Sequence, residues 1–226
     1  MKKRLIAMLL AGAMCASIAG CSTGTGSTGT ESGGESAGSD GAQYHISVVL
    51  KTLAAEYWQF VEAGVNAYAE EHPDEVSVEV KGPPSETSFQ EQLNMIQTDL
   101  GDDTYDGYII SPLQQDMVAN LIADTEKPVI ALDTDIESDK VLSFVGTGNE
   151  AAAKLGAVAA VEAAKEAGWE NIQCIEIAGV QGDSTNTARM NGYKAGIEEA
   201  GGDFLEDEVQ YADATATRAV DAMNGI

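Results

Sequence analysis

From Tyr44 onward, short runs of apolar and β-branched residues alternate with longer runs that carry apolar residues at helical spacing. The short runs are continuously apolar, which is typical of strands buried on both faces of a parallel sheet. Alternation of this kind predicts an α/β fold with parallel, doubly wound sheets. The predicted strands are "HISVVL", "VSVEV", "DGYIIS", "PVIALD", "LSFVG" and "IQCIEIAG", with a weaker strand over 204–211.

Several of the predicted helices carry boundary signals. Ser88 followed by Glu91 fits a capping box at the start of the second helix. Pro112 fits the first position of the third helix. Further helices are predicted over 149–167, over 184–200 and at the end of the chain. The first helix, closed by Pro73, is predicted to bury one face made of Val61, Val65, Tyr68 and Ala69.

Residues that directly follow the predicted strands are candidates for ligand binding, because open parallel sheets bind ligands outside the carboxyl ends of their strands. They are Lys51, Asp133, Asp135 and the segments 146–149 and 181–184.

The first twenty residues combine a positive "MKKR" with an apolar run too short to span a membrane, and "IAGC" follows. This pattern resembles the lipobox of bacterial lipoproteins. The resemblance implies that residues 1–20 are a signal peptide that includes Cys15, and that Cys21 carries a lipid anchor. The protein would then be extracytoplasmic, in the periplasm or on the outer face of the plasma membrane. The alternative is an ordinary signal peptide with a chance cysteine.

Residues 21–43 are dominated by Gly, Ser and Thr and contain no large apolar side chain. Such a segment cannot bury enough surface to offset the entropy of ordering. It is predicted to be a flexible linker that spans roughly 25 Å between the anchor and the folded body.

The charge balance excludes some partners. The chain has 12 basic and 37 acidic residues, and three basic residues precede Cys21, so the remainder carries 9 basic residues and a charge of −28. We expect no nucleic-acid binding, because phosphates would be repelled. Apart from Cys21, only Cys174 remains beyond the signal peptide. Its apolar setting predicts a small buried hydrophobe, and no disulfide framework is expected.

Four sequence blocks resemble the sugar-binding proteins of bacterial ABC importers, of the ribose- and allose-binding type. They are "ISVVLKTLAAEYWQFVEAG", "VIALDTDI", "FVGTGNEAAAKLGA" and "GDSTNTARMNGYKAGI", in the family's order. The resemblance implies a monomeric, two-lobed periplasmic-binding-protein-like type I fold, with an N-terminal lobe over 44–147 and a C-terminal lobe over 148–226. It also implies that a sugar, or a similar small polar ligand, binds between the lobes and passes to an importer permease.

The resemblance implies that certain aromatic and acidic residues contact the ligand. These residue types suit a pyranose, which has apolar faces and a rim of hydroxyls. Tyr57 and Trp58 match the family's stacking aromatics, although they could instead staple the first helix. Asp133 matches the hydroxyl-binding acid, although it could be a solvated or capping residue.

Three further contacts are implied by the same resemblance. Arg189 matches an arginine that reaches into the cleft, with a surface ion pair as the alternative. Lys51 matches a cleft lysine of the allose-like branch. Asn149 matches an asparagine at the first crossover, with a helix cap as the alternative. Where the family commonly has Asn-Pro this chain has Ala55-Glu56, and where it has Asp-Asn this chain has Gly148-Asn149, which leaves the sugar undetermined.

Other functions were weighed against sugar transport. "GTGNEA" fits a dinucleotide fingerprint and would suggest an NAD-linked oxidoreductase. However, the following strand does not end in an acid, since Glu176 precedes Ile177 and would point along the strand. A receptor that presents its ligand to a sensor or chemotaxis partner remains open. We see no metal cluster and no activated nucleophile in the sequence, so we expect no cofactor and no enzyme activity.

The resemblance also predicts that the second lobe is incomplete, because the family continues for roughly another third of its length. We therefore expect exposed apolar surface over 172–177 and 219–223, little tight sugar binding by these 226 residues, and faster amide exchange in the second half.

Overall fold

Five parallel strands form the sheet of residues 44–145, which we name the first lobe, in the order β2-β1-β3-β4-β5. The computed structural model describes residues 41–226, so the predicted signal peptide, Cys21 and nearly all of the linker lie outside the described residues. The described residues fall in one compact unit. The strands are β1 (Tyr44–Val49), β2 (Val76–Lys81), β3 (Gly107–Ile110), β4 (Val129–Leu132) and β5 (Val141–Val145).

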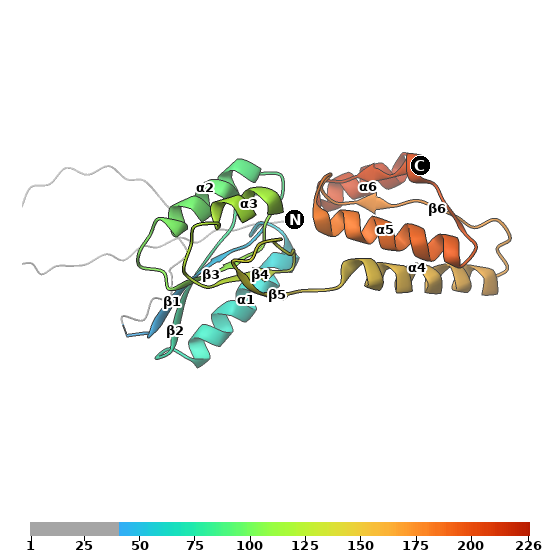
Figure 1. Cartoon of the computed structure of the whole chain (residues 1–226). Coiled ribbons are helices and arrows are strands. Elements are labelled where there is room, and N and C mark those ends of the chain that lie inside the picture. Colours follow the sequence, from blue (N-terminus) through green and yellow to red (C-terminus); the bar gives the residue numbers. More distant parts are fainter. Residues whose placement is uncertain (1–40) are drawn as a thin grey trace, which may run out of the picture. The chain divides into compact units, whose positions relative to one another are not determined.

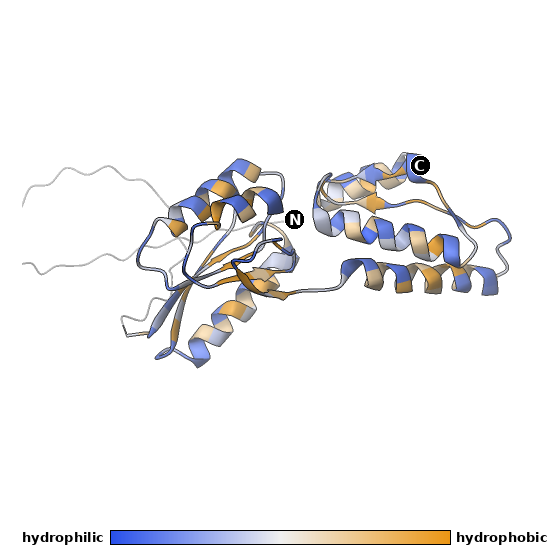
Figure 2. Ribbon diagram, viewed as in Figure 1, coloured by the Kyte–Doolittle hydropathy of each residue, from blue (hydrophilic) through white to orange (hydrophobic). Residues whose placement is uncertain are grey.

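Helices cover both faces of this sheet, α1 on one side and α2 and α3 on the other (Figure 1). Adjacent residues of one strand face opposite sides: Val48 packs in the α1 cluster, whereas Val49 packs in the α2 and α3 cluster. This explains the continuous apolar strands, visible in orange in Figure 2. The predicted α/β fold with a doubly wound parallel sheet is confirmed. The helices are α1 (Glu56–Glu71), α2 (Phe89–Leu100) and α3 (Gln115–Leu121).

The edge strand β5 departs from the prediction of two covered faces. Leu142, Phe144 and Val145 are exposed, Leu142 to 71%, and only Val141 packs against the core. β5 pairs with β4 alone. The apolar run therefore predicted the strand β5 correctly, but it overstated how many of the side chains of β5 are buried.

The second lobe, as we name residues 149–224, is built on two helices that run side by side in the same direction. α4 (Asn149–Glu166) and α5 (Ser184–Glu199) approach closely at Gly192 and Gly196. A Cβ atom at these positions would lie 2.9 Å from that of Ala153 and 2.8 Å from that of Ala157, and closer still to the backbone carbonyls of Glu150 and Lys154. Glycine is therefore what permits this helix contact.

The strands of the second lobe are short. "IQCIEIAG" was predicted as one strand, but it forms β6 (Gln173–Cys174) and β7 (Ile177–Ala178), which pair with β8 (Asp203–Phe204) and β9 (Gln210–Tyr211) in separate sheets. The weak strand over 204–211 is likewise divided by a 3-10 turn, η1 (Glu206–Glu208). The final helix is α6 (Ala216–Asn224).

Of the two predicted boundary signals, that of the second helix is correct in position only, and that of the third helix is wrong. Ser88 is the N-cap of α2, but its hydroxyl lies 2.9 Å from that of Ser85 and makes no capping bond to the helix. α3 begins at Gln115 rather than at Pro112. Between these two residues, the Leu113 N–H donates a hydrogen bond to the buried Gln92 side chain, at 2.7 Å.

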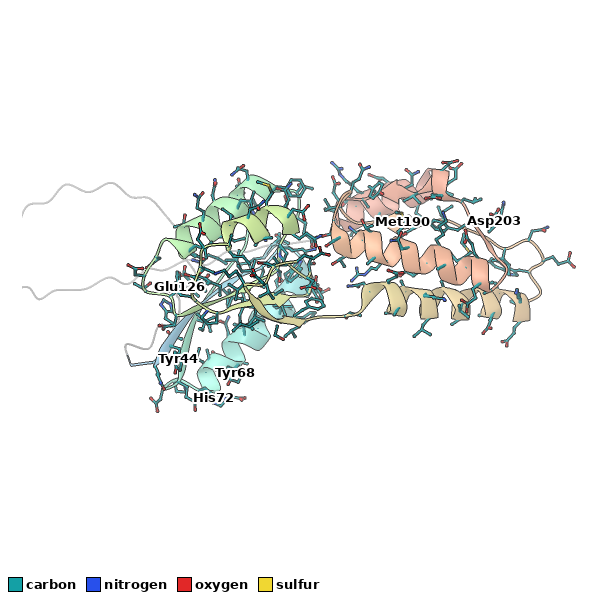
Figure 3. All side chains as sticks on the ribbon, in the orientation of Figure 1. Tyr44, Tyr68, His72, Glu126, Met190 and Asp203 are labelled. Atoms are coloured by element: carbon teal, nitrogen blue, oxygen red, sulfur yellow. The ribbon has the colours of Figure 1, made fainter. Side chains whose placement is uncertain are left out.

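The predicted buried face of α1 is correct only in part. Val61 and Val65 pack against the sheet, but Tyr68 is 57% exposed and its ring stacks on His72. Figure 3 labels both residues at the C-terminal end of α1. Ala69 is half-buried, so the spacing was wrong about Tyr68 alone.

Exposure in the second lobe also differs from expectation. Val220 and Met223 of α6 are exposed, as predicted, but Ile172 is buried in the core with Val161, Ile197 and Phe204. Cys174 is half-buried, and burial raises the pKa of its thiol.

Within residues 41–226, no helix combines the length and the apolar character that crossing a membrane requires.

Candidate functional site

A cavity of about 680 Å³ lies at the carboxyl ends of the first-lobe strands, the position expected for a ligand site in an open α/β sheet. Its volume suits a small ligand. Both lobes contribute to its lining. Five of the six predicted ligand contacts line it, namely Lys51, Tyr57, Trp58, Asp133 and Arg189.

The two aromatic residues sit side by side in the first turn of α1. Trp58 is buried among Val48 and Leu50, and its indole N–H donates to Glu86 at 2.8 Å. Tyr57 is 56% exposed and packs edge-on against Trp58, with ring centroids 4.9 Å apart. Trp58 is thus both a core residue and part of the cavity wall, whereas most of the Tyr57 ring is free for a ligand.

Asp133 follows β4 in a left-handed backbone conformation, with φ of 64°. A non-glycine residue there is uncommon, although aspartate tolerates it better than most, and such outliers concentrate at functional sites. The carboxylate accepts a hydrogen bond from the Tyr57 hydroxyl at 3.0 Å. Burial and the negative charge of Asp133 raise the pKa of Tyr57, so its phenol stays a hydrogen-bond donor.

Lys51 reaches from the end of β1 to the second lobe. Its ammonium lies 2.5 Å from the carboxylate of Asp183, and both side chains are more than nine-tenths buried. Asp183 is also the N-cap of α5, because it accepts the Asn186 backbone N–H at 2.9 Å. Beside the pair, the hydroxyls of Thr134 and Thr185 lie 2.9 Å apart. The sequence singled out 181–184 by position but did not reveal this ion pair.

Arg189 lines the cavity from α5, and it forms no ion pair, the alternative role, with any residue that the structure describes. Its Nε donates to Asn149 at 2.8 Å. Asn149 itself is not in the cavity lining and is not the helix cap, since Gly148 is the N-cap of α4. Asn149 therefore stands behind Arg189 and orients its guanidinium.

Glu176 lies elsewhere than the sequence predicts. It does not simply point along its strand, because it lines the cavity in the gap between β6 and β7. Burial raises the pKa of its carboxyl group, and the charge of Arg189 opposes this only in part. A charged residue inside an apolar strand was the signal that could have identified it.

In the part of the chain that the structure describes, no three His, Cys, Asp or Glu side chains are grouped so that they could hold a metal ion.

The geometry can be compared with known proteins. No curated protein matches the chain in sequence. Residues 46–226, most of the chain, match the family described as "Periplasmic binding protein domain". The chain belongs to this family. It is a family of extracytoplasmic binding proteins rather than enzymes, so the oxidoreductase suggested by "GTGNEA" is ruled out.

Solved structures share the fold of this periplasmic binding protein domain. An ABC transporter solute-binding protein from Agrobacterium vitis with bound D-fucose has a TM-score of 0.70 and 21% identity over 80% of this chain and 62% of its own. A carbohydrate transporter solute-binding protein from Agrobacterium radiobacter, in complex with D-arabinose, has a TM-score of 0.73 and 23% identity over 81% and 62%. One from Actinobacillus succinogenes with D-allose has a TM-score of 0.67 and 18% identity over 81% and 64%. The chain thus spans less than two thirds of each.

Proposed function

We propose that the protein is a solute-binding lipoprotein that captures a pentose- or hexose-like sugar in the cavity and delivers it to an ABC importer. The observation that carries this proposal is the lining of the cavity. An exposed aromatic ring, Tyr57, stands beside carboxylate and guanidinium groups that can each bind a pair of hydroxyls. The structural neighbours solved with D-fucose, D-arabinose and D-allose support the same ligand class.

We propose that the aromatic and the charged residues of the site contact different parts of the sugar. Tyr57 and Trp58 supply apolar faces for the C–H surface of the ring, and Asp133 and Arg189 bind hydroxyls. Lys51 is held by Asp183, so it acts through that pair on the geometry of the cavity as well as through any direct contact. Asn149 contributes by holding Arg189.

Calorimetry against a panel of pentoses and hexoses tests this proposal. At least one sugar should bind, and the titration should extend to millimolar concentrations. Trp58→Ala and Asp133→Ala should each weaken binding about twentyfold or abolish it, since each removes about 2 kcal/mol of ligand contact. Glu70→Ala, on the exposed face of α1, should have no effect. Absence of binding by every sugar in the panel would refute the ligand class.

The lipid anchor is part of the proposal and has its own test. Cys21→Ser should abolish labelling by a radioactive fatty acid and shift the protein from membranes to the soluble fraction. Cys15→Ser, inside the segment proposed to be removed, should leave labelling and location unchanged. Label retained by the Cys21→Ser protein would show that the anchor is elsewhere or absent.

A further inference from the structure

Glu176 is a buried carboxyl group in the cavity for which the proposed function gives no role. It is 9% exposed, and it lines the cavity together with Ile177 and Ala178. Its Oε2 atom has no hydrogen-bond partner among the described residues. A buried polar oxygen without a partner is costly, and nearly all such atoms in folded proteins are paired. Glu176 therefore offers the cavity an acceptor oxygen that a bound molecule could pair with.

The other acidic groups of the cavity are already engaged, which sets Glu176 apart. Each of them accepts a hydrogen bond from a neighbouring side chain, Asp183 from Lys51, Asp133 from Tyr57 and Glu86 from Trp58. The positive charge that acts on Glu176 is that of Arg189, but this guanidinium donates its Nε–H to Asn149 instead. Glu176 thus has a cation in its neighbourhood but no hydrogen bond from it.

The charge of the cavity favours a cationic ligand over a neutral one. Acidic side chains in the lining outnumber basic ones, since Glu86, Asp133, Glu176 and Asp183 face only Lys51 and Arg189. A hydroxyl would satisfy a free oxygen of Glu176 without offsetting its charge. An ammonium group would do both, because it carries three donors and forms the stronger, charge-assisted hydrogen bond.

We propose that the ligand carries a positively charged amino group that pairs with Glu176, in addition to hydroxyls bound elsewhere in the cavity; the ligand class is an amino sugar. This inference rests on the proposed function, because it assumes that the cavity binds a sugar-like molecule. It goes beyond that function by naming the group that distinguishes the ligand from neutral sugars.

Binding of an amino sugar should depend on pH in a stated direction. Burial raises the pKa of Glu176, so its carboxyl group stays protonated to a higher pH than an exposed one. An ammonium pairs with the ionised form, so affinity should fall as the pH is lowered through that pKa, whereas affinity for a neutral sugar should fall less. The other titratable or charged groups that line the cavity are Lys51, Tyr57, Glu86, Asp133, Asp183, Arg189 and Tyr193.

The test compares matched sugars by calorimetry: glucosamine and galactosamine, the parent hexoses glucose and galactose, and the two N-acetyl derivatives, which keep the nitrogen but lose its charge. At neutral pH, at least one amino sugar should bind tenfold or more tightly than its parent hexose and its N-acetyl derivative. This comparison uses the unaltered protein, so it does not depend on whether any variant folds.

The variant Glu176→Gln then tests whether Glu176 causes the preference for amino sugars. Glutamine has the same shape and no charge, so amino-sugar affinity should fall about tenfold or more while hexose affinity changes by less than about threefold. Glu162→Gln, which removes one charge from the exposed side of α4, should leave the preference intact. If hexoses bind as tightly as amino sugars, or if Glu176→Gln leaves the preference unchanged, the inference is overturned while the proposed function stands. If none of these sugars binds, both fall.

Discussion

Replacing Lys51 with methionine should lower the free energy of unfolding by about 3 kcal/mol, as measured by urea denaturation. Methionine fills most of the volume of lysine but leaves the carboxylate of Asp183 buried without its cation. The Asp183 side chain is only 8% exposed, so water compensates poorly for the lost ammonium. Breaking a buried ion pair by removing one partner is among the most costly single changes in a protein.

A second variant separates the effect of the unpaired Asp183 charge on stability from the effect of altered packing at Lys51. Lys51→Met combined with Asp183→Asn removes both charges and keeps a good N-cap for α5, because asparagine caps helices as well as aspartate does. The double variant should therefore recover most of the lost stability. If Lys51→Met alone costs less than about 1 kcal/mol, or if the double variant is as unstable as the single one, the ion pair does not have the role described.

Replacing Gly192 or Gly196 with alanine should destabilise the second lobe by about 3 kcal/mol in each case. The added methyl group would collide with the backbone of α4 as well as with Ala153 or Ala157. Backbone carbonyls cannot move aside as a flexible side chain can, so the two helices must separate and the core between them must open. Amide hydrogen exchange should accelerate across α4 and α5 while the sheet of the first lobe stays protected.

Gly156→Ala is the matched control for this steric effect. Gly156 lies on α4 with nothing within 4 Å of an added Cβ, so alanine there should stabilise the helix by about 0.5 to 1 kcal/mol. If Gly192→Ala and Gly156→Ala change stability in the same direction, the close contact of α4 with α5 is not what requires glycine at position 192.

The candidate site shows how far sequence reasoning could reach. Position after a strand was enough to select Lys51, Asp133 and the segment that contains Asp183, because parallel strands all present their carboxyl ends at one edge. It was not enough to pair Lys51 with Asp183, since the two residues are 132 positions apart and meet only when the second lobe packs against the first. Nor did position reveal that Asn149, predicted as a ligand contact, accepts a hydrogen bond from Arg189 and lies outside the cavity lining.

Local signals failed where contacts outside the motif competed with them. The capping box at Ser88 did not form because another hydroxyl, that of Ser85, bonds to Ser88 instead. The proline at position 112 did not start a helix, and the Leu113 N–H that follows it donates to Gln92, buried in α2. Both competing groups belong to segments that the boundary motifs do not include.

The sequence by itself determined the fold class, the order of the elements and the edge of the sheet where the cavity lies. Those properties follow from hydrophobic periodicity and from the geometry of parallel strands, which are local or nearly so. Only the tertiary structure decided which charges are paired, which helices touch through glycine and which acid is left without a partner. Pairing and burial depend on distances between segments far apart in the chain, and Glu176 became distinct only when Asp133, Asp183 and Glu86 were seen to be engaged.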